Sequence, residues 1–264
     1  MTTVTQKYQP QHPIRIITAT SLFDGHDASI NMIRRLLQEG GAEVIHLGHN
    51  RSVLDVVKAA LQEGAQGICM SSYQGGHMEY FKYMKDLLDQ AGAGYVRIYG
   101  GGGGVIIHEE KKALEEYGIA QIFHPDDGRR LGLEGMINMI IEGCDFDLVA
   151  KANHAKKHQP FEKENPVPST EIGIALTQVE NTGQNLDPEK WGLSSFLKKG
   201  KTPLVLGMTG TGGAGKSSLI DELVQRYLNA YPNKKIAVVC VDPSKRKTGG
   251  SLLGDRIRMN SLSR

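Results

Sequence analysis

The sequence predicts an α/β protein with a doubly wound parallel sheet, followed by the first part of a second α/β unit. One observation is that five short β-rich runs alternate with amphipathic helical stretches between residues 13 and 145. Another is a glycine-rich loop between an apolar run and an amphipathic stretch, which lies beyond a polar, proline-bearing segment. We therefore divide the chain into a domain at 13–145, a linker at 146–200 and an incomplete second domain at 201–264.

The five expected strands of the first domain are Ile14–Ala19, Glu43–Leu47, Gly67–Ser71, Val96–Tyr99 and Gln121–Phe123. Apolar residues at helical spacing predict helices between them, for example Ile30, Ile33, Leu36 and Leu37, then Val53, Val56, Val57 and Leu61, and then Phe81, Met84, Leu87 and Leu88. Right-handed crossovers favour a flavodoxin-like strand order of 2-1-3-4-5. Ligands of such sheets bind beyond the carboxyl ends of the strands, so the loops after strands 1, 3 and 4 are the candidate site.

The second domain is expected to begin with a strand–loop–helix–strand unit. We expect strands at Pro203–Leu206 and Ile236–Val241, with a helix from Gly215 to Leu228 between them. In the preceding linker we expect only a short helix near Glu171–Val179.

Composition narrows the classes of protein to consider. The formal net charge of +2 is too small to indicate a nucleic acid or an anionic membrane as partner, and 39% hydrophobic residues predict a buried core. The N-terminus has no signal-like apolar region, and no stretch reaches the roughly 18 apolar residues of a membrane span. Cys69 and Cys240 lie in apolar runs and are expected to be buried thiols, which indicates a reducing, cytoplasmic location.

The loop after the first strand carries Asp24 and His26, which could form a metal ligand with its supporting carboxylate. Neutral imidazole is a good ligand for cobalt and similar metals, and a carboxylate on the other ring nitrogen fixes the tautomer. The alternative is a surface role for this loop, with Asp27 or Ser29 capping the next helix.

Two further loops at the same edge of the sheet support a ligand site. Ser71, Ser72 and Tyr73 follow the third strand and precede two glycines, and five consecutive glycines, Gly100–Gly104, follow the fourth. Glycines allow close approach of the backbone, so we expect a wall of bare backbone against a flat or elongated ligand. A response-regulator receiver and a flavodoxin do not fit, because the strand-3 aspartate of the first and the phosphate loop of the second are missing.

These three loops resemble the cobalamin-binding domain of adenosylcobalamin-dependent mutases, whose motifs are D-x-H-x-x-G, S-x-L and G-G. The resemblance implies that His26 binds cobalt in place of the cofactor's own base, and that the displaced tail enters a slot. Serine replaces the last glycine of the first motif, and tyrosine replaces the leucine of the second, so we expect Ser29 to cap the helix and Tyr73 to narrow the slot. The residues assigned to the cofactor are Asp24, His26, Ser29, Ser71, Tyr73, Gly103 and Gly104.

The glycine-rich loop of the second domain fits G-x-x-x-x-G-K-[ST] in full and lies between an apolar run and a helix. Its expected phosphate-binding residues are Gly210, Gly212, Gly213, Ala214, Gly215, Lys216, Ser217 and Ser218. Lys216 should reach the β- and γ-phosphates, and Ser217 should bind Mg²⁺. The sequence from 201 to 260 also resembles the G-protein chaperones of cobalamin mutases, which implies that Asp242 and Asp255 lie near Mg²⁺.

The order of the two domains resembles the start of the fused isobutyryl-CoA mutases. The resemblance implies an isomerase that interconverts isobutyryl-CoA and n-butyryl-CoA, with adenosylcobalamin, GTP and Mg²⁺ as cofactors. It also implies an acyl-CoA-binding barrel outside this chain and a homodimer of the full-length protein. The 264 residues alone are expected to lack mutase activity and to hydrolyse nucleotide poorly. The alternative is a free-standing cobalamin carrier or sensor with an appended P-loop NTPase.

Overall fold

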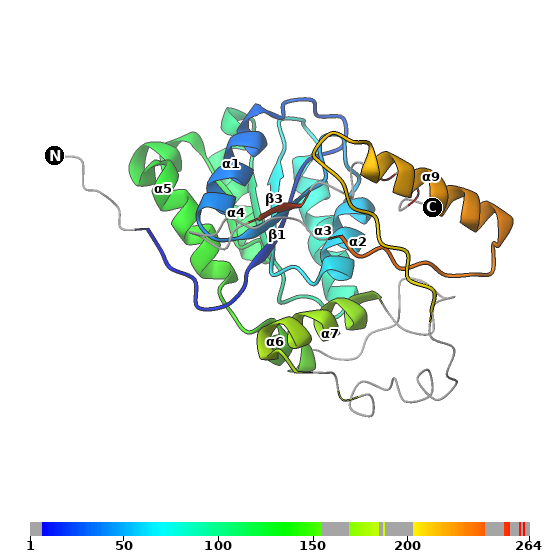
Figure 1. The fold of residues 1–264 in the computed structure, drawn as a ribbon. Coiled ribbons are helices and arrows are strands. Elements are labelled where there is room, and N and C mark those ends of the chain that lie inside the picture. Colours follow the sequence, from blue (N-terminus) through cyan, green and yellow to red (C-terminus); the bar gives the residue numbers. More distant parts are fainter. Residues whose placement is uncertain are drawn as a thin grey trace.

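The computed structural model places a parallel sheet between two layers of helices (Figure 1) and describes residues 7–154, 169–184, 187, 203–240, 251–253, 259 and 261. The first five strands are β1 (Arg15–Thr20), β2 (Glu43–His46), β3 (Gly67–Ser71), β4 (Arg97–Gly101) and β5 (Gln121–Phe123). Their order across the sheet is β5-β4-β3-β1-β2, and each neighbouring pair is parallel. The doubly wound, 2-1-3-4-5 prediction is therefore confirmed.

A sixth strand that the sequence did not predict extends the sheet. This strand, β6 (Ser251–Leu253), lies parallel to β2, with Leu252 opposite Val44. Its three residues are too few to show a period, so no pattern separated them from the polar sequence around them. The backbone groups on the outer side of β2 find their partners in this segment.

The helices divide between the two faces of the sheet as the strand alternation requires. On one face lie α1 (Ala28–Glu39) and α5 (Pro125–Cys144), and on the other lie α2 (Val53–Glu63), α3 (His77–Gln90) and α4 (His108–Tyr117). Successive strand residues point to opposite faces, so Ile16 belongs to the core under α1 and α5, whereas Ile17 belongs to the other core.

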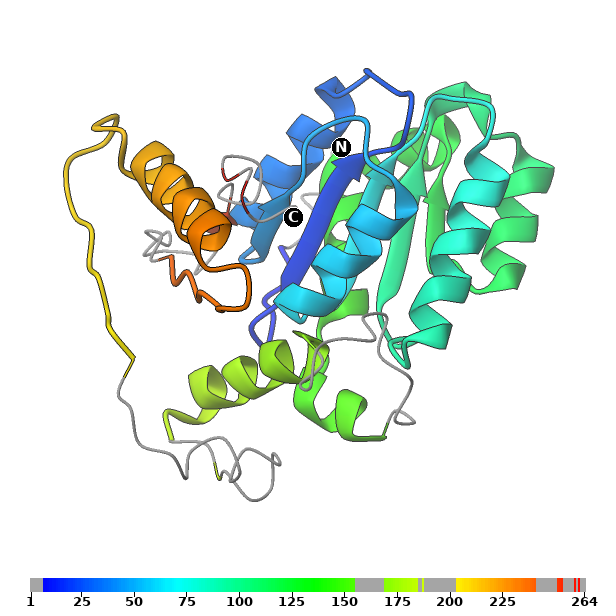
Figure 2. The same ribbon diagram turned by 90° about the vertical axis from the view of Figure 1, so that its right-hand side faces the viewer.

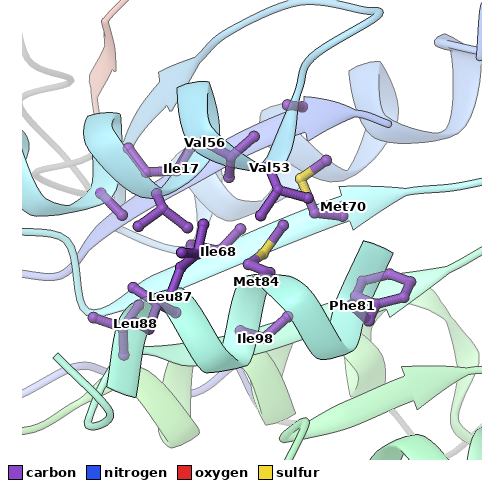
Figure 3. Packing of buried hydrophobic residues seen from close by; sticks show 14 of the residues in the cluster. Ile17, Val53, Val56, Ile68, Met70, Phe81, Met84, Leu87, Leu88 and Ile98 are labelled. Atoms are coloured by element: carbon purple, nitrogen blue, oxygen red, sulfur yellow. The ribbon is translucent and has the colours of Figure 1, made fainter. Parts of the chain in front are cut away.

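The larger core lies between the sheet and helices α2 and α3. Figure 3 shows strand residues such as Ile68 and Ile98 packed against Met84 and Leu87 of α3. All four side chains are almost fully buried, and each contributes roughly 1.5–3 kcal/mol of hydrophobic stabilisation relative to an exposed position. This packing fixes the strands rigidly, and with them the loops at their carboxyl ends.

Helix α2 has clear start and stop signals. The backbone N–H of Asp55 donates to the Ser52 hydroxyl at 3.2 Å, and the backbone N–H of Ser52 donates to the Asp55 carboxylate at 3.4 Å. This capping box satisfies two amides that the first turn leaves unpaired. At the other end, Gly64 adopts a left-handed conformation with φ of 60°, which ends the helix with little steric cost.

The described part of the segment expected to be a linker contains two helices beneath the amino ends of the strands (Figure 2). The predicted short helix is confirmed as α7 (Ser169–Thr182), whereas α6 (Leu148–His154) was not predicted. Helix α7 packs against α2, where a Cβ added at Gly173 would lie 2.9 Å from the carbonyl oxygen of Gln62. Glu180 of α7 also lies 3.4 Å from the Arg15 guanidinium.

In the second domain, the predicted helix is confirmed as α9 (Lys216–Ala230). The two predicted strands are wrong, because residues 203–206 and the described part of 236–241 are irregular. An apolar run forms a strand only where a neighbour supplies hydrogen bonds, and neither run pairs with a described strand; Leu204 is 98% exposed. Cys240 is likewise exposed rather than buried. Among the described helices, none is long and apolar enough to cross a membrane.

Candidate functional site

The loop after β1 holds an exposed imidazole against a buried carboxylate. His26 Nδ1 lies 2.9 Å from Asp24 Oδ1, and the backbone N–H of His26 donates to the same oxygen at 2.9 Å. The Asp24 side chain is 1% exposed, whereas that of His26 is 76% exposed. Because a carboxylate occupies Nδ1, the Nε2 atom of this ring remains available as a ligand.

The environment of Asp24 keeps its carboxyl ionised. Burial alone would raise its pKa, but hydrogen bonds from the backbone N–H groups of Tyr73 and His26, and then from the His26 ring, lower the pKa below its ordinary value of 3.8. The Tyr73 N–H donates to Asp24 Oδ2 at 2.5 Å. Asp24 therefore fixes the His26 ring and also joins the loops that follow β1 and β3.

Ser29 does not cap α1 as the sequence predicted. The N-cap residue is Asp27, whose side chain makes no capping hydrogen bond, and Ser29 is already the second residue of the helix. Its hydroxyl lies 3.2 Å from the Tyr73 hydroxyl instead, within hydrogen-bonding distance. The Tyr73 ring is also 5.4 Å from that of His26, centre to centre, so Ser29, Tyr73 and His26 form one group at this edge of the sheet.

A cavity of about 310 Å³ opens beside this group. Ser71, Tyr73 and Gly103 line it, and its apolar walls include Ile30, Ile33, Met136 and Ile140. Within the described part of the chain, the Ser71 hydroxyl oxygen is buried and has no hydrogen-bond partner. An unpaired buried hydroxyl costs free energy, so this oxygen indicates a ligand that supplies a polar atom here.

The glycine run after β4 is packed as well as exposed to the cavity. Gly100, Gly101, Gly102 and Gly103 all line the cavity, as the sequence led us to expect for a wall of backbone. A Cβ at Gly102 would nevertheless lie 1.9 Å from the Ser72 carbonyl oxygen, and Gly103 has a φ of 58°. Around Gly104 there is open space, with no atom within 4 Å of an added Cβ.

The structure adds His124 to the cavity wall, a residue that the sequence analysis missed. Only its place directly after β5 could have indicated it. Its Nδ1 lies 3.1 Å from Asp126 Oδ2, and His108 Nε2 lies 3.2 Å from the same oxygen. The positive ends of α4 and α5 meet here, and Arg129 lies 2.8 Å from Asp126, so we assign no cation to these three residues.

The phosphate-binding motif forms a glycine loop directly before α9. Gly213 and Gly215 have φ angles of 77° and 81°, which favour glycine, and the Lys216 ammonium donates to the Thr211 carbonyl oxygen at 2.8 Å. The other predicted members of the loop and its helix are Gly210, Gly212, Ala214, Ser217 and Ser218. The first-turn amides of α9 are suited to phosphate oxygens. The predicted magnesium residues Asp242 and Asp255 lie outside the described residues.

Comparison with known proteins assigns both regions. A family model described as the B12 binding domain matches residues 14–128, and one described as the methylmalonyl Co-A mutase-associated GTPase MeaB matches residues 172–264. Over 259 residues, 97% of its length, the chain is 57% identical to the fused isobutyryl-CoA mutase of Geobacillus kaustophilus. The chain belongs to the fused isobutyryl-CoA mutase family. It matches the N-terminal portion of these proteins.

Two other relatives show which part of the family is present. The fused isobutyryl-CoA mutase of Cupriavidus metallidurans is 51% identical over 96% of this chain, and the chain spans only about a quarter of such relatives, 24% and 23% of the two named here. The 2-hydroxyisobutanoyl-CoA mutase small subunit of Aquincola tertiaricarbonis is 32% identical over 44% of this chain and 84% of the relative. The sheet is thus a cobalamin-binding domain, and the phosphate loop belongs to a guanine-nucleotide-binding GTPase portion that uses Mg²⁺.

Proposed function

We propose that this chain is the cofactor- and nucleotide-binding portion of an adenosylcobalamin-dependent isomerase that interconverts isobutyryl-CoA and n-butyryl-CoA. The Asp24–His26 pair carries the proposal, because it offers a metal-binding nitrogen at the edge of the sheet where ligands of this architecture bind. The relatives that match nearly the whole chain carry that mutase name.

The residues at this edge fit cobalamin. The exposed imidazole would provide a ligand for cobalt, the cavity of about 310 Å³ would provide room for an inserted tail, and Ser71 would provide an unpaired buried hydroxyl for a polar atom of that tail. When bound, adenosylcobalamin supplies the radical for the carbon-skeleton rearrangement by cleavage of its cobalt–carbon bond.

Each residue then has a distinct task. His26 would hold cobalt through Nε2, while Asp24 would keep the proton on Nδ1 and so keep the ring in the ligating tautomer. Tyr73 and Ser29 close the side of the cavity next to His26, and the glycine backbone at Gly103 would let the tail approach the sheet, while the resemblance adds Gly104. The apolar walls exclude water from the tail.

The phosphate loop adds a second task, control of cofactor loading by nucleotide. Lys216 would exchange its present contact with Thr211 for the β- and γ-phosphates of GTP, and Ser217 would bind Mg²⁺. The resemblance assigns Asp242 and Asp255 to the same ion. We propose that GTP turnover gates loading and release of cobalamin, as the match to the mutase-associated GTPase suggests.

The proposal has three further parts: an acyl-CoA-binding barrel and a homodimer, which rest on the resemblance, and a cytoplasmic location, which rests on two cysteines. The acyl-CoA-binding barrel and a homodimer remain predictions for the full-length protein. A cytoplasmic location is supported by Cys69 and Cys144, which are buried and form no disulfide.

Electron paramagnetic resonance of the cob(II)alamin complex tests the role of His26. Protein made with ¹⁵N-labelled histidine should change the superhyperfine pattern, because nitrogen from the protein replaces the cofactor's own base. The His26→Ala variant should lose the effect, and His49→Ala, a change at an exposed histidine in the loop after β2, should keep it. Asp24→Asn should weaken binding by about 10–100-fold, the usual result of losing a carboxylate behind a ligating histidine. A pattern that the label leaves unchanged would exclude histidine ligation.

A further inference from the structure

Phe23 stands out in the loop after β1, three residues before His26. Its side chain is 86% exposed, and its φ of 63° places it in the left-handed region. A bulky residue in this region is a steric outlier, and an exposed aromatic ring loses the free energy of burial. The chain alone gives no packing reason for either feature.

The unusual backbone of Phe23 is held by a second loop. Its N–H donates to Asn50 Oδ1 at 2.8 Å, and Asn50 itself has a φ of 55°. The two loops are also joined by the backbone N–H of Arg51, which donates to the Thr20 carbonyl oxygen at 3.1 Å. Strain of this kind persists where the surrounding structure imposes it, and it is concentrated at sites of ligand contact.

We propose that Phe23 contacts the lower face of the corrin ring, and that Asn50 is the positioning residue that holds Phe23 there. This inference rests on the proposed cobalamin site. The corrin is a flat macrocycle with apolar faces, and burying a phenyl ring against it would remove the exposed apolar surface. Phe23 lies at most roughly 11 Å of extended chain from His26, so one macrocycle above His26 can cover both residues.

The strand order places this contact across from the tail slot. The strand residues that line the cavity with Ser71 come from β3, β4 and β5, which lie on one side of β1. Asn50 follows β2, which lies on the other side of β1. His26, in the loop after β1, therefore lies between two supports: the slot anchors the tail on one side, and Phe23 supports the ring on the other. With support on both sides of the ligating nitrogen, the tilt of the ring is fixed.

Equilibrium dialysis of the 264-residue chain with adenosylcobalamin tests this assignment. Phe23→Ala and Phe23→Gly should each weaken binding on the order of 10-fold, the effect of leaving a phenyl-sized contact unmade. Asn50→Ala should weaken binding by a smaller factor, since the ring stays but its position is released. Tyr83→Ala, a change at an exposed aromatic residue within α3, should leave affinity unchanged.

Two readouts separate a contact from a folding role. Phe23→Gly should melt at or above the wild-type temperature without cofactor, because glycine accepts the left-handed backbone, and yet it should bind cobalamin more weakly. The absorption change that reports replacement of the cofactor's base by histidine should persist in Phe23→Ala and vanish in His26→Ala. Wild-type affinity in both Phe23 variants would overturn the inference, and it would indicate that the exposed Phe23 side chain contacts another protein surface instead of the corrin. Wild-type affinity and spectrum in His26→Ala would instead overturn the proposed function.

Discussion

Asp24 and His46 are both buried, but Asp24 is charged and His46 is neutral at neutral pH, and the surroundings of each residue explain the difference. Asp24 keeps its charge because N–H groups from two loops and the His26 ring surround its carboxylate. His46 lies at the end of β2, where burial, followed by the charge of Arg34, lowers its pKa to about 4. Its Nδ1 lies 3.0 Å from the Thr18 hydroxyl, which suits a neutral ring. The first residue therefore serves a ligand site, and the second limits the acid stability of the sheet.

The pKa of His46 makes a prediction about stability and pH. The unfolded chain binds a proton at His46 below about 6.5, whereas the folded chain does so only below about 4, so stability falls as the pH drops between these values. The shift corresponds to roughly 3 kcal/mol of free energy of unfolding. His46→Gln should remove most of this dependence in urea unfolding of the cofactor-free chain at pH 7 and pH 4.5. His49→Gln serves as the exposed control. If the free energy of unfolding of His46→Gln falls between pH 7 and pH 4.5 as much as that of the wild type, the assignment is refuted.

Sequence reasoning found the residues whose role follows from their place at a strand end. Asp24 and His26 lie in the loop after the first predicted strand and Ser71 ends the third, so strand order alone brings these positions to one edge of the sheet. Ser29, Phe23 and Asn50 could not be interpreted in this way. The hydroxyl partner of Ser29 and the left-handed backbones of the other two arise from contacts between loops that are distant in sequence.

At the scale of the element, the glycine loop after β4 is the most constrained feature of the site. Gly102→Ala would place a Cβ 1.9 Å from the Ser72 carbonyl oxygen, so the β3 and β4 loops would have to separate. We expect a loss of about 1–3 kcal/mol in stability and weaker cobalamin binding, because the shifted Ser72 adjoins the slot. Thermal unfolding and equilibrium dialysis measure the two effects. Gly75→Ala, in the loop after β3, has open space around it and lies outside the cavity wall, so it is the matched control, and equal effects of the two changes would contradict this account.

Elements with a strong period were predicted well, and elements that depend on a neighbour were not. The five strands and the α1, α2 and α3 faces follow from residues that alternate or recur within one segment. The expected strands at 203–206 and 236–241 have the right composition but no partner, whereas β6 has a partner and only three residues. Strand formation in these cases is decided by pairing, which local sequence does not encode.

At the scale of the whole molecule, the described residues of the cobalamin-binding domain are far better buried than those that precede the phosphate loop. Leu204, Val205 and Leu206 are mostly exposed and lie in an irregular segment, whereas the strands of the sheet are buried on both faces. Limited proteolysis should therefore cut within residues 203–210 well before it cuts between β1 and α5. Mass spectrometry of the early fragments measures this, and the larger product should still bind cobalamin. Early cleavage inside the sheet domain would show that the order of stability is reversed.

Helix α7 has a consequence for how the two family regions are joined. The match to the mutase-associated GTPase begins at residue 172, inside a helix whose Ile174 and Ala175 are buried and whose Gly173 touches the end of α2. The start of the region matched by the GTPase family model therefore packs against the sheet domain. A gene truncated at residue 172 would remove most of α7, which covers the amino ends of the strands of the sheet domain. Gly173 of α7 also lies next to Gly64, which ends α2 and precedes β3. A displacement of α7 would therefore act first on Gly64 and, through β3, on Ser71 at the other end of that strand.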